Sequence, residues 1–252
     1  MATYKKRGNK KHKGNQVNLE DKSTTAEVFN TLDETASKTE EWAIKNQKYI
    51  FIIVGLAAII VLGYLGYKKF IVEPKSSEAM NEMFTAQKYF DQAVNATEKD
   101  SLFTLALNGG EGKFGMLDIV NEYSGTPAAN LARYYAGMSY LNLRDYPNAI
   151  AFLEDFSSDD IILSAIAKGG IGDAFAQLNQ PENALEYYEK AIAVSDNEFT
   201  APMYLFKAGN VALTLGDNSK ALKYFERIKN EFSASTEATN IDEFIGKAEA
   251  SL

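Results

Sequence analysis

The chain has 252 residues, no cysteine, one histidine (His12) and a formal net charge of −8. The lack of cysteine excludes disulfides, thiolate nucleophiles and cysteine-based zinc sites, and a single histidine leaves little room for histidine-based metal or catalytic centres. We therefore expect a protein that is not an enzyme and that needs no metal and no cofactor.

The first residues differ sharply from the rest of the chain in charge. Residues 1–13 carry six lysines and arginines and no acid, whereas residues 76–252 carry 26 acidic and 13 basic residues. Residues 1–24 are polar and aperiodic, which predicts a disordered basic tail. The acidic body should repel nucleic acid and anionic lipid, so nucleic acid is not an expected partner.

Residues 25–48 follow with apolar side chains at helical spacing and predict a weakly amphipathic juxtamembrane helix. It either lies partly at the membrane surface, contacts a membrane partner, or serves as a simple stalk. The 19 residues from Tyr49 to Tyr67 contain no charge and would span about 28 Å as a helix. This run is apolar on every face, which predicts a transmembrane helix over 49–72 rather than a buried core helix.

The basic tail also suggests an orientation for this span. Lysines close to the span are equal in number on its two sides, so the six positive charges in residues 1–13 decide. Short cytoplasmic segments are enriched in Lys and Arg, whereas long translocated domains follow no such rule. We therefore expect a cytoplasmic N-terminus and residues 76–252 on the far side, which in a bacterial inner membrane is the periplasm.

Residues 128–235 repeat themselves, with 35 and then 37 residues between corresponding glycines. Counted from the glycine, the three segments share a packing residue at +3, an alanine at +12 and a large apolar residue at +16. The members are Gly137, Tyr140, Ala149 and Leu153; Gly172, Phe175, Ala184 and Tyr188; and Gly209, Ala212, Ala221 and Phe225. The period is close to the roughly 34 residues of a tetratricopeptide repeat, a helix–turn–helix unit. We expect repeats at about 130–160, 165–196 and 202–235.

Small residues at the shared positions would let the first helix of each repeat, helix A, approach the second, helix B. Upstream, residues 78–123 predict a degenerate helix pair, with one helix at 78–96, a glycine-rich link, and a second helix from Lys113 to Tyr123. Residues 240–252 predict a closing helix, because the end of a solenoid needs a polar outer face. The fold class is all-α: one N-terminal transmembrane helix followed by a tetratricopeptide-type solenoid over 76–252.

Helix A of each repeat is the expected partner-binding element. Residues at −6, −3, +1 and +4 from each repeat glycine form the candidate groove: Leu131, Tyr134, Met138 and Leu141; Ile166, Gly169, Asp173 and Ala176; and Met203, Phe206, Asn210 and Leu213. Methionine and aromatic side chains together suit adaptable binding of a peptide or helix. The alternative is that several of these side chains pack against the next repeat or the C-terminal helix.

Three sequence strings carry a resemblance to a known family. They are the run from Tyr123 to Gly137 (YSGTPAANLARYYAG), Gly172-Asp173-Ala174, and the run from Asn197 to Pro202 (NEFTAP). Together with the anchor and the repeats, they resemble tetratricopeptide membrane proteins of Bacteroidota that belong with the ancillary subunit of the SecYEG translocon. The similarity covers roughly residues 25–250. It implies a periplasmic domain beside the Sec channel that cooperates with a membrane-anchored, prolyl-isomerase-like periplasmic chaperone, and it implies no catalytic residues.

Two functional hypotheses follow. The first is a non-catalytic, membrane-anchored accessory subunit of the Sec translocon, whose partners are Sec channel subunits, that chaperone, or emerging secreted chains. The alternative is a scaffold for envelope assembly or division that uses the same solenoid without the Sec channel. The sequence does not separate the two.

Overall fold

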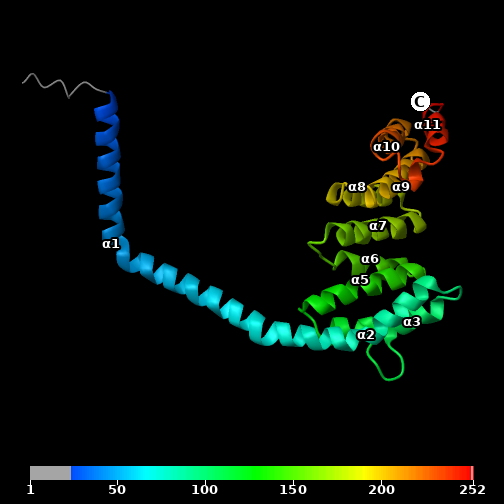
Figure 1. Cartoon of the computed structure of the whole chain (residues 1–252), viewed down its shortest axis with the longest axis horizontal. Helices are drawn as coiled ribbons and strands as arrows, with labels where there is room; N and C mark the ends of the chain where they lie inside the picture. Colours follow the sequence, from blue (N-terminus) through cyan, green and yellow to red (C-terminus); the bar gives the residue numbers. More distant parts are fainter. Residues whose placement is uncertain (1–23, 251) are drawn as a thin grey trace, which may run out of the picture. The chain divides into compact units, whose positions relative to one another are not determined.

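The computed structural model describes residues 24–250 and 252, with side chains from residue 40 onward. The predicted disordered tail therefore lies outside the described residues, except for Thr24, where the first helix begins. The described residues form helices and no strand, which confirms the all-α prediction (Figure 1). Contacts divide the chain after Leu65 into two units, the first containing most of α1 and the second containing the helical repeats.

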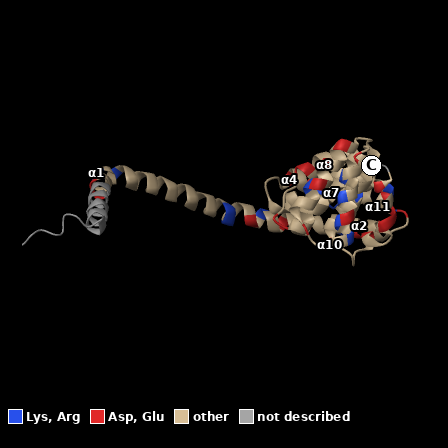
Figure 2. Ribbon diagram, turned by 90° about the horizontal axis from the view of Figure 1, so that it is seen from above, with Lys and Arg blue, Asp and Glu red and all other residues tan. Residues whose placement is uncertain are grey.

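Helix α1 (Thr24–Tyr67) holds the candidate membrane span. An 18-residue window of the helix has a mean hydropathy of 2.5, and none of it is buried within the protein. Side chains on different faces are open to the surroundings, with Ile59, Ile60 and Leu62 each about 70% exposed (68%, 70% and 68%). The C-terminal part of α1, from Tyr49 to Tyr67, carries no charged residue (Figure 2). The predicted juxtamembrane helix and the start of the predicted span are thus one continuous helix.

A widened helical turn, Lys68–Val72, connects α1 to α2 (Glu73–Asn95). Pro74 lies in the first turn of α2 and has no N–H to donate to a carbonyl in the preceding turn. A π-type turn accommodates the proline ring without ending the helix, because it shifts the hydrogen-bond register. The span was predicted to end at residue 72 and the next helix to begin at 78, but the helix continues through this region and α2 begins at Glu73.

The three repeats consist of six helices in antiparallel pairs. Their bounds are α5 Pro127–Asn142 and α6 Tyr146–Glu154, α7 Ile161–Gln177 and α8 Pro181–Val194, and α9 Thr200–Thr214 and α10 Asn218–Glu231. The side chain of Asp160 accepts hydrogen bonds from the backbone N–H groups of Ile162 and Leu163 and so caps α7. Helices α5, α7 and α9 are the A helices.

The same turn joins helix A to helix B in every repeat. The residue seven positions after the repeat glycine is left-handed: Arg144 (φ 63°), Asn179 (φ 57°) and Gly216 (φ 76°). The next residue donates its N–H to the carbonyl five residues earlier, at 2.9–3.0 Å. This is the Schellman pattern, which satisfies the last carbonyls of helix A. In the third repeat glycine adopts this conformation without the steric cost of a Cβ atom.

The repeat glycines lie where helix B crosses helix A. A Cβ atom added to each would lie 2.4–2.6 Å from the residue at +16, in the pairs Gly137 with Leu153, Gly172 with Tyr188, and Gly209 with Phe225. The alanines at +12 are completely buried. The +16 residue, rather than the packing residue at +3, therefore fills the space above each glycine.

The region before the repeats contains three helices rather than two. Helix α3 (Asp100–Asn108) occupies part of the segment predicted as a link, and α4 (Met116–Glu122) follows. Phe103 of α3 is completely buried, and its ring lies 5.5 Å from that of Phe90. The ring of Phe90 in turn packs against the ring of Tyr135 of α5, with their centroids 5.0 Å apart. These rings join α2, α3 and α5 into one hydrophobic core.

Helix α11 (Ile241–Glu249) packs against α10 at the C-terminal end of the repeats, within the range predicted for a closing helix. Ile241 and Ala248 are its buried side chains. A short 3₁₀ turn, Thr236–Ala238, precedes it. The solenoid therefore ends on an amphipathic helix whose other face is polar.

Candidate protein-binding surface

The solvent-facing sides of α5, α7 and α9 form a continuous surface, which we call the helix A face. Apart from Gly169, every predicted groove residue on it is half-buried: Leu131, Tyr134, Met138, Leu141, Ile166, Asp173, Ala176, Met203, Phe206, Asn210 and Leu213. The offsets −6, −3, +1 and +4 lie on one side of a helix because 3.6 residues make a turn. The structure therefore gathers these side chains on one surface, although not all of them are free to bind a partner.

One predicted position is closed by the next repeat. A Cβ atom added to Gly169 would lie 1.9 Å from Cε1 of Tyr204, whose side chain is only 2% exposed. The −3 position of the second repeat is thus filled by an aromatic ring from α9. Gly169 is a packing residue, and its inclusion in the groove was wrong.

Phe206, the −3 residue of the third repeat, packs mainly within the protein. Its ring lies 4.8 Å from that of Phe244 in α11 and 6.1 Å from that of Phe225 in α10. This is the alternative that the sequence left open, packing against the C-terminal helix. The side-chain amide of Asn210 donates to the carbonyl of Phe206 at 2.9 Å and is likewise engaged within α9.

Tyr134 and Met138 line the boundary between the first and second repeats. The Tyr134 ring lies 5.3 Å from Phe156, and both Tyr134 and Met138 pack against buried residues of α6 and α7. A Cβ atom added to Gly170 would contact the Met138 sulfur at 3.4 Å and Leu141 at 3.6 Å. Small residues of α7 therefore let side chains of α5 lie across it.

Asp173 forms an ion pair between adjacent A helices. Lys207 Nζ of α9 lies 2.7 Å from both carboxylate oxygens, and the Tyr188 hydroxyl donates to Oδ1 at 2.8 Å. Burial, followed by the Asp173 charge, raises the pKa of Tyr188. Asp173 and Leu141 also line an open pocket of about 520 Å³, together with Arg144. The predicted groove residues thus include one charged cluster that ties two repeats together.

Tyr134 is expected to make the stability of the solenoid sensitive to alkaline pH. Burial raises the pKa of Tyr134 to about 12, with a smaller effect from Tyr135, whereas a tyrosine in an unfolded chain has a pKa of about 10. Between these values the unfolded chain loses this proton and the folded chain keeps it. The stabilising contribution is therefore complete below about pH 10 and is lost as the pH rises through about 12. Denaturant unfolding at several pH values should show a shallower decline in the free energy of unfolding for Tyr134→Phe than for the wild type. If the free energy of unfolding declined equally with pH in the two proteins, the raised pKa of Tyr134 would be contradicted.

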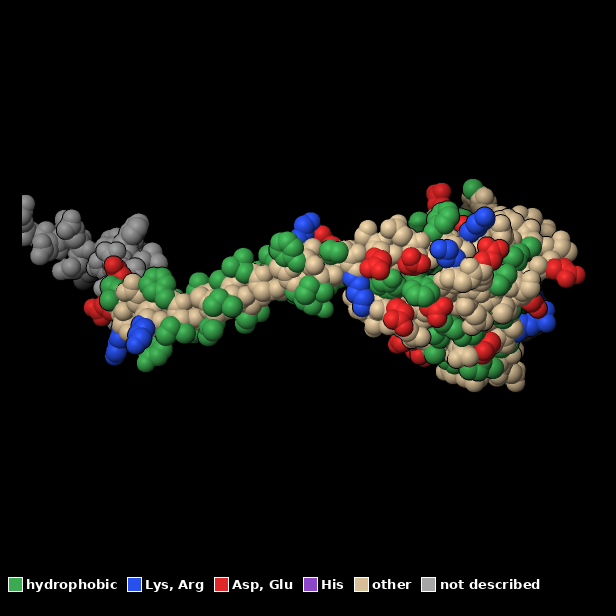
Figure 3. Space-filling view, turned by 90° about the horizontal axis from the view of Figure 1, so that it is seen from below, with side chains coloured by type: hydrophobic (Ala, Val, Ile, Leu, Met, Phe, Trp, Pro, Cys, Tyr) green, Lys and Arg blue, Asp and Glu red, His purple; other side chains and the backbone are tan. Residues whose placement is uncertain are grey.

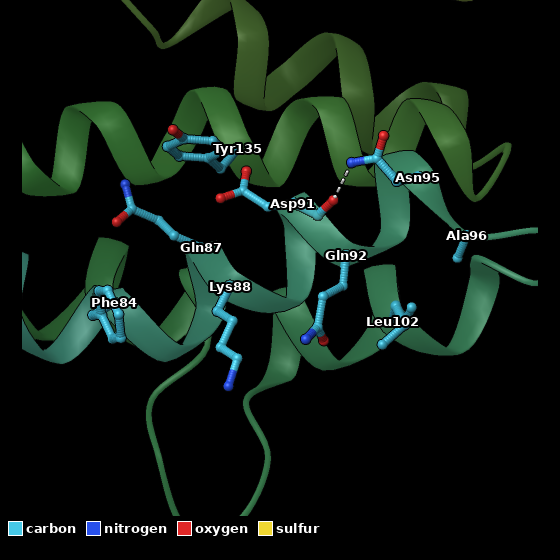
Figure 4. A pocket seen from close by; sticks show the side chains of 9 residues that line it. All are labelled: Phe84, Gln87, Lys88, Asp91, Gln92, Asn95, Ala96, Leu102 and Tyr135. Atoms are coloured by element: carbon cyan, nitrogen blue, oxygen red, sulfur yellow. Dashed lines mark hydrogen bonds between the residues drawn. The ribbon is translucent and has the colours of Figure 1, made fainter.

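A larger pocket, of about 740 Å³, lies over α2, α3 and α5 (Figure 4). Gln87, Asp91 and Asn95 extend from α2 on the side of Tyr135, whereas Lys88 and Gln92 extend on the other side. Phe84 is 67% exposed at one end. The sequence analysis did not predict this pocket because residues 78–123 lack the repeat signature. A usable signal for it was the presence of apolar residues outside the apolar face of an otherwise amphipathic helix.

Comparison with known families places two matches on the repeats. A model described as a tetratricopeptide repeat matches residues 170–235, and another with the same description matches residues 131–159. These segments contain the repeat glycines and the antiparallel pairs described above. The chain carries tetratricopeptide repeats.

Part of this chain is similar to a crystal structure from Podosopora anserina. That protein is described as a kinesin light chain with nearly identical tetratricopeptide-like repeats. The sequence identity is 12%, the TM-score is 0.47, and the match covers 70% of this chain and 87% of that one. No curated protein matches the chain significantly. Tetratricopeptide repeats indicate a scaffold for protein–protein interaction, and the repeats described here contain no feature that indicates an enzyme.

Proposed function

We propose that this protein is a non-catalytic, single-pass membrane scaffold whose tetratricopeptide repeats bind protein partners through the helix A face. The observation that carries the proposal is an uncovered apolar helix in the same chain as the tetratricopeptide repeats. In water, side chains such as Ile59 and Leu62 would be exposed at a cost of about 25 cal/mol for each Å² of apolar surface. A lipid environment removes that cost, and 19 uncharged residues suffice to cross it.

Photocrosslinking would locate the binding surface directly. A photoreactive amino acid at Ile166 or Met203, both half-buried on the helix A face, should capture a partner in cells. The matched control positions are Glu182 and Glu226, which are exposed on α8 and α10. Capture from the control positions alone would place binding on the helix B side and overturn this part of the proposal.

The proposed topology has the N-terminus in the cytoplasm and the repeats in the bacterial periplasm. It rests on the six basic residues within 1–13, because short cytoplasmic segments are enriched in Lys and Arg, whereas a long domain such as residues 76–252 is translocated largely regardless of its charge. A reporter that is active only in the periplasm should work when fused after Leu252 and fail when fused before Thr24. The reverse pattern would overturn the topology and every periplasmic partner with it.

As the specific role, we propose an accessory subunit of the Sec translocon. The support is the combination of an apolar helix, helical repeats and the three strings that resemble the ancillary SecYEG family. The partners would be Sec channel subunits, a membrane-anchored periplasmic chaperone resembling prolyl isomerases, and secreted chains emerging from the channel.

Affinity purification after mild detergent extraction tests this role. The functional tagged protein should recover Sec channel subunits well above a control with an unrelated single-span protein. Failure to recover them, while other envelope factors crosslink to the solenoid, would favour a scaffold for envelope assembly or division. That outcome would leave the proposed membrane-anchored scaffold intact and would overturn the proposed translocon role.

A further inference from the structure

The solenoid exposes large apolar side chains along one edge of the repeats. Within described residues 96–250, three such side chains are exposed: Ile161 (56%), Ile162 (43%) and Phe199 (70%). All three lie where helix B of one repeat leads into helix A of the next. Ile162 and Phe199 occupy the same repeat position, ten residues before Gly172 and Gly209. The second and third repeats therefore share an exposed large apolar side chain at this position.

The connections that carry these side chains share one edge of the solenoid, because antiparallel helix pairs place every B-to-A connection at the same end. Side-chain contacts link neighbouring connections. Asn130, at the start of α5, exchanges two hydrogen bonds with the backbone of Ser157, in the α6–α7 connection. Arg227 of α10 binds Asp196, in the α8–α9 connection, at 2.6 Å. The connections therefore form a rim along this edge of the repeats.

This rim is strongly acidic. We define the acidic edge as the connections 122–126, 154–162, 194–199 and 231–240. They contain nine acidic residues and no lysine or arginine: Glu122, Glu154, Asp155, Asp159, Asp160, Asp196, Glu198, Glu231 and Glu237. Acidic side chains also outnumber basic ones on the solenoid surface seen in Figure 3. Exposed apolar side chains and anionic side chains thus share the same edge.

Several of these carboxylates remain available to a partner. Asp160 caps α7, and Asp196 and Glu231 bind Arg227. In the described part of the chain, no lysine or arginine lies within ion-pair distance of Asp155, Asp159 or Glu198. Unpaired carboxylates therefore flank the exposed isoleucines and Phe199.

We propose that the acidic edge binds a cationic amphipathic polypeptide segment, in which lysines or arginines accompany large apolar side chains. The apolar side chains of such a segment would cover Ile162 and Phe199, and its cations would meet the unpaired carboxylates. An exposed apolar patch with charges of one sign around it selects a partner of opposite charge. Anionic lipid is repelled, as is the body of a second copy, whose residues 76–252 are equally acidic. This surface is separate from the helix A face.

Peptide binding to the full chain in nanodiscs of zwitterionic lipid tests the proposal. The probe is a fluorescent Lys/Leu peptide of about 18 residues with leucines at helical spacing, and its comparator has glutamate in place of lysine. Fluorescence anisotropy, corrected with empty nanodiscs, should show binding of the lysine peptide only. The affinity should fall at least about tenfold in the double variant Ile162→Ser, Phe199→Ser and in the triple variant Asp155→Asn, Asp159→Asn, Glu198→Gln.

The matched control replaces exposed apolar residues elsewhere, Met80→Ser with Phe84→Ser on α2, which are 42% and 67% exposed. This variant should bind within about twofold of the wild type, and circular dichroism should show all variants folded. Equal binding of the two peptides, or unchanged affinity in both folded edge variants, would overturn the proposal. Loss of binding only in the α2 variant would also overturn it and would assign the peptide to the α2 surface.

Discussion

Replacement of Gly169 by alanine is expected to lower the free energy of unfolding by about 2–3 kcal/mol, the upper part of the range of about 1–3 kcal/mol typical of overpacking a filled core. The added Cβ would lie 1.9 Å from the Tyr204 ring, and that ring is 2% exposed and has little space into which it can move. The second and third repeats would therefore have to separate locally. Denaturant unfolding of the full chain in mild detergent, followed by circular dichroism, measures the effect.

Gly246→Ala is the matched control. Gly246 also lies within a helix, α11, but no neighbouring side chain or other element lies within 4 Å of the position of an added Cβ. Alanine there should stabilise by up to about 1 kcal/mol, because glycine is a poor helix former. Adding Tyr204→Leu to Gly169→Ala should recover part of the loss. A Gly169→Ala chain as stable as the Gly246→Ala chain would mean that Tyr204 does not hold the two repeats together.

Replacement of Phe103 by alanine is expected to cost about 3–5 kcal/mol, as for a large aromatic side chain lost from a core. Phe103 is completely buried and lies edge-on to Phe90, which contacts Tyr135. Its loss would leave a cavity between α2, α3 and α5, the helices around the 740 Å³ pocket. The same unfolding experiment, combined with hydrogen exchange of α2 and α3, measures the loss and locates it.

Thr104→Ala provides the comparison within the same helix. Thr104 is exposed, and its hydroxyl donates only to the Asp100 carbonyl within α3. Its replacement should change stability by less than about 0.5 kcal/mol. If Phe103→Ala were equally mild, α3 would not be an integral part of the core.

The repeat fold could be predicted in detail because its contacts recur at fixed spacing along the chain. Gly172, Ala184 and Tyr188 illustrate this, since one crossing of helix A by helix B brings all three together. Residues 100–108 could not be recognised as a helix in the same way. Their side chains pack on the preceding helix, α2, and on α5 further along the chain, and no repeat spacing marks them.

The candidate site was predictable as a surface and not residue by residue. Helical periodicity alone places Leu131, Tyr134 and Met138 on one side of α5. Whether a residue on that side is free depends on what the neighbouring repeat places against it. Phe206 meets Phe244 of α11, a contact set by the closing helix rather than by any property of α9.

The sequence by itself determined the apolar helix and the helical repeats, because both depend on local periodicity and composition. Nineteen consecutive residues without a charge are favoured in lipid over water. A glycine followed sixteen positions later by a large apolar residue, recurring at spacings of 35 and 37 residues, indicates repeated pairs of crossing helices. Only the tertiary structure decided that Tyr204 covers Gly169, that Asp173 pairs with Lys207, and that exposed Phe199 lies on an acidic edge. Each of these contacts or exposures depends on how one repeat stacks on the next. Stacking is set by side chains that are far apart in sequence and meet only in the folded chain.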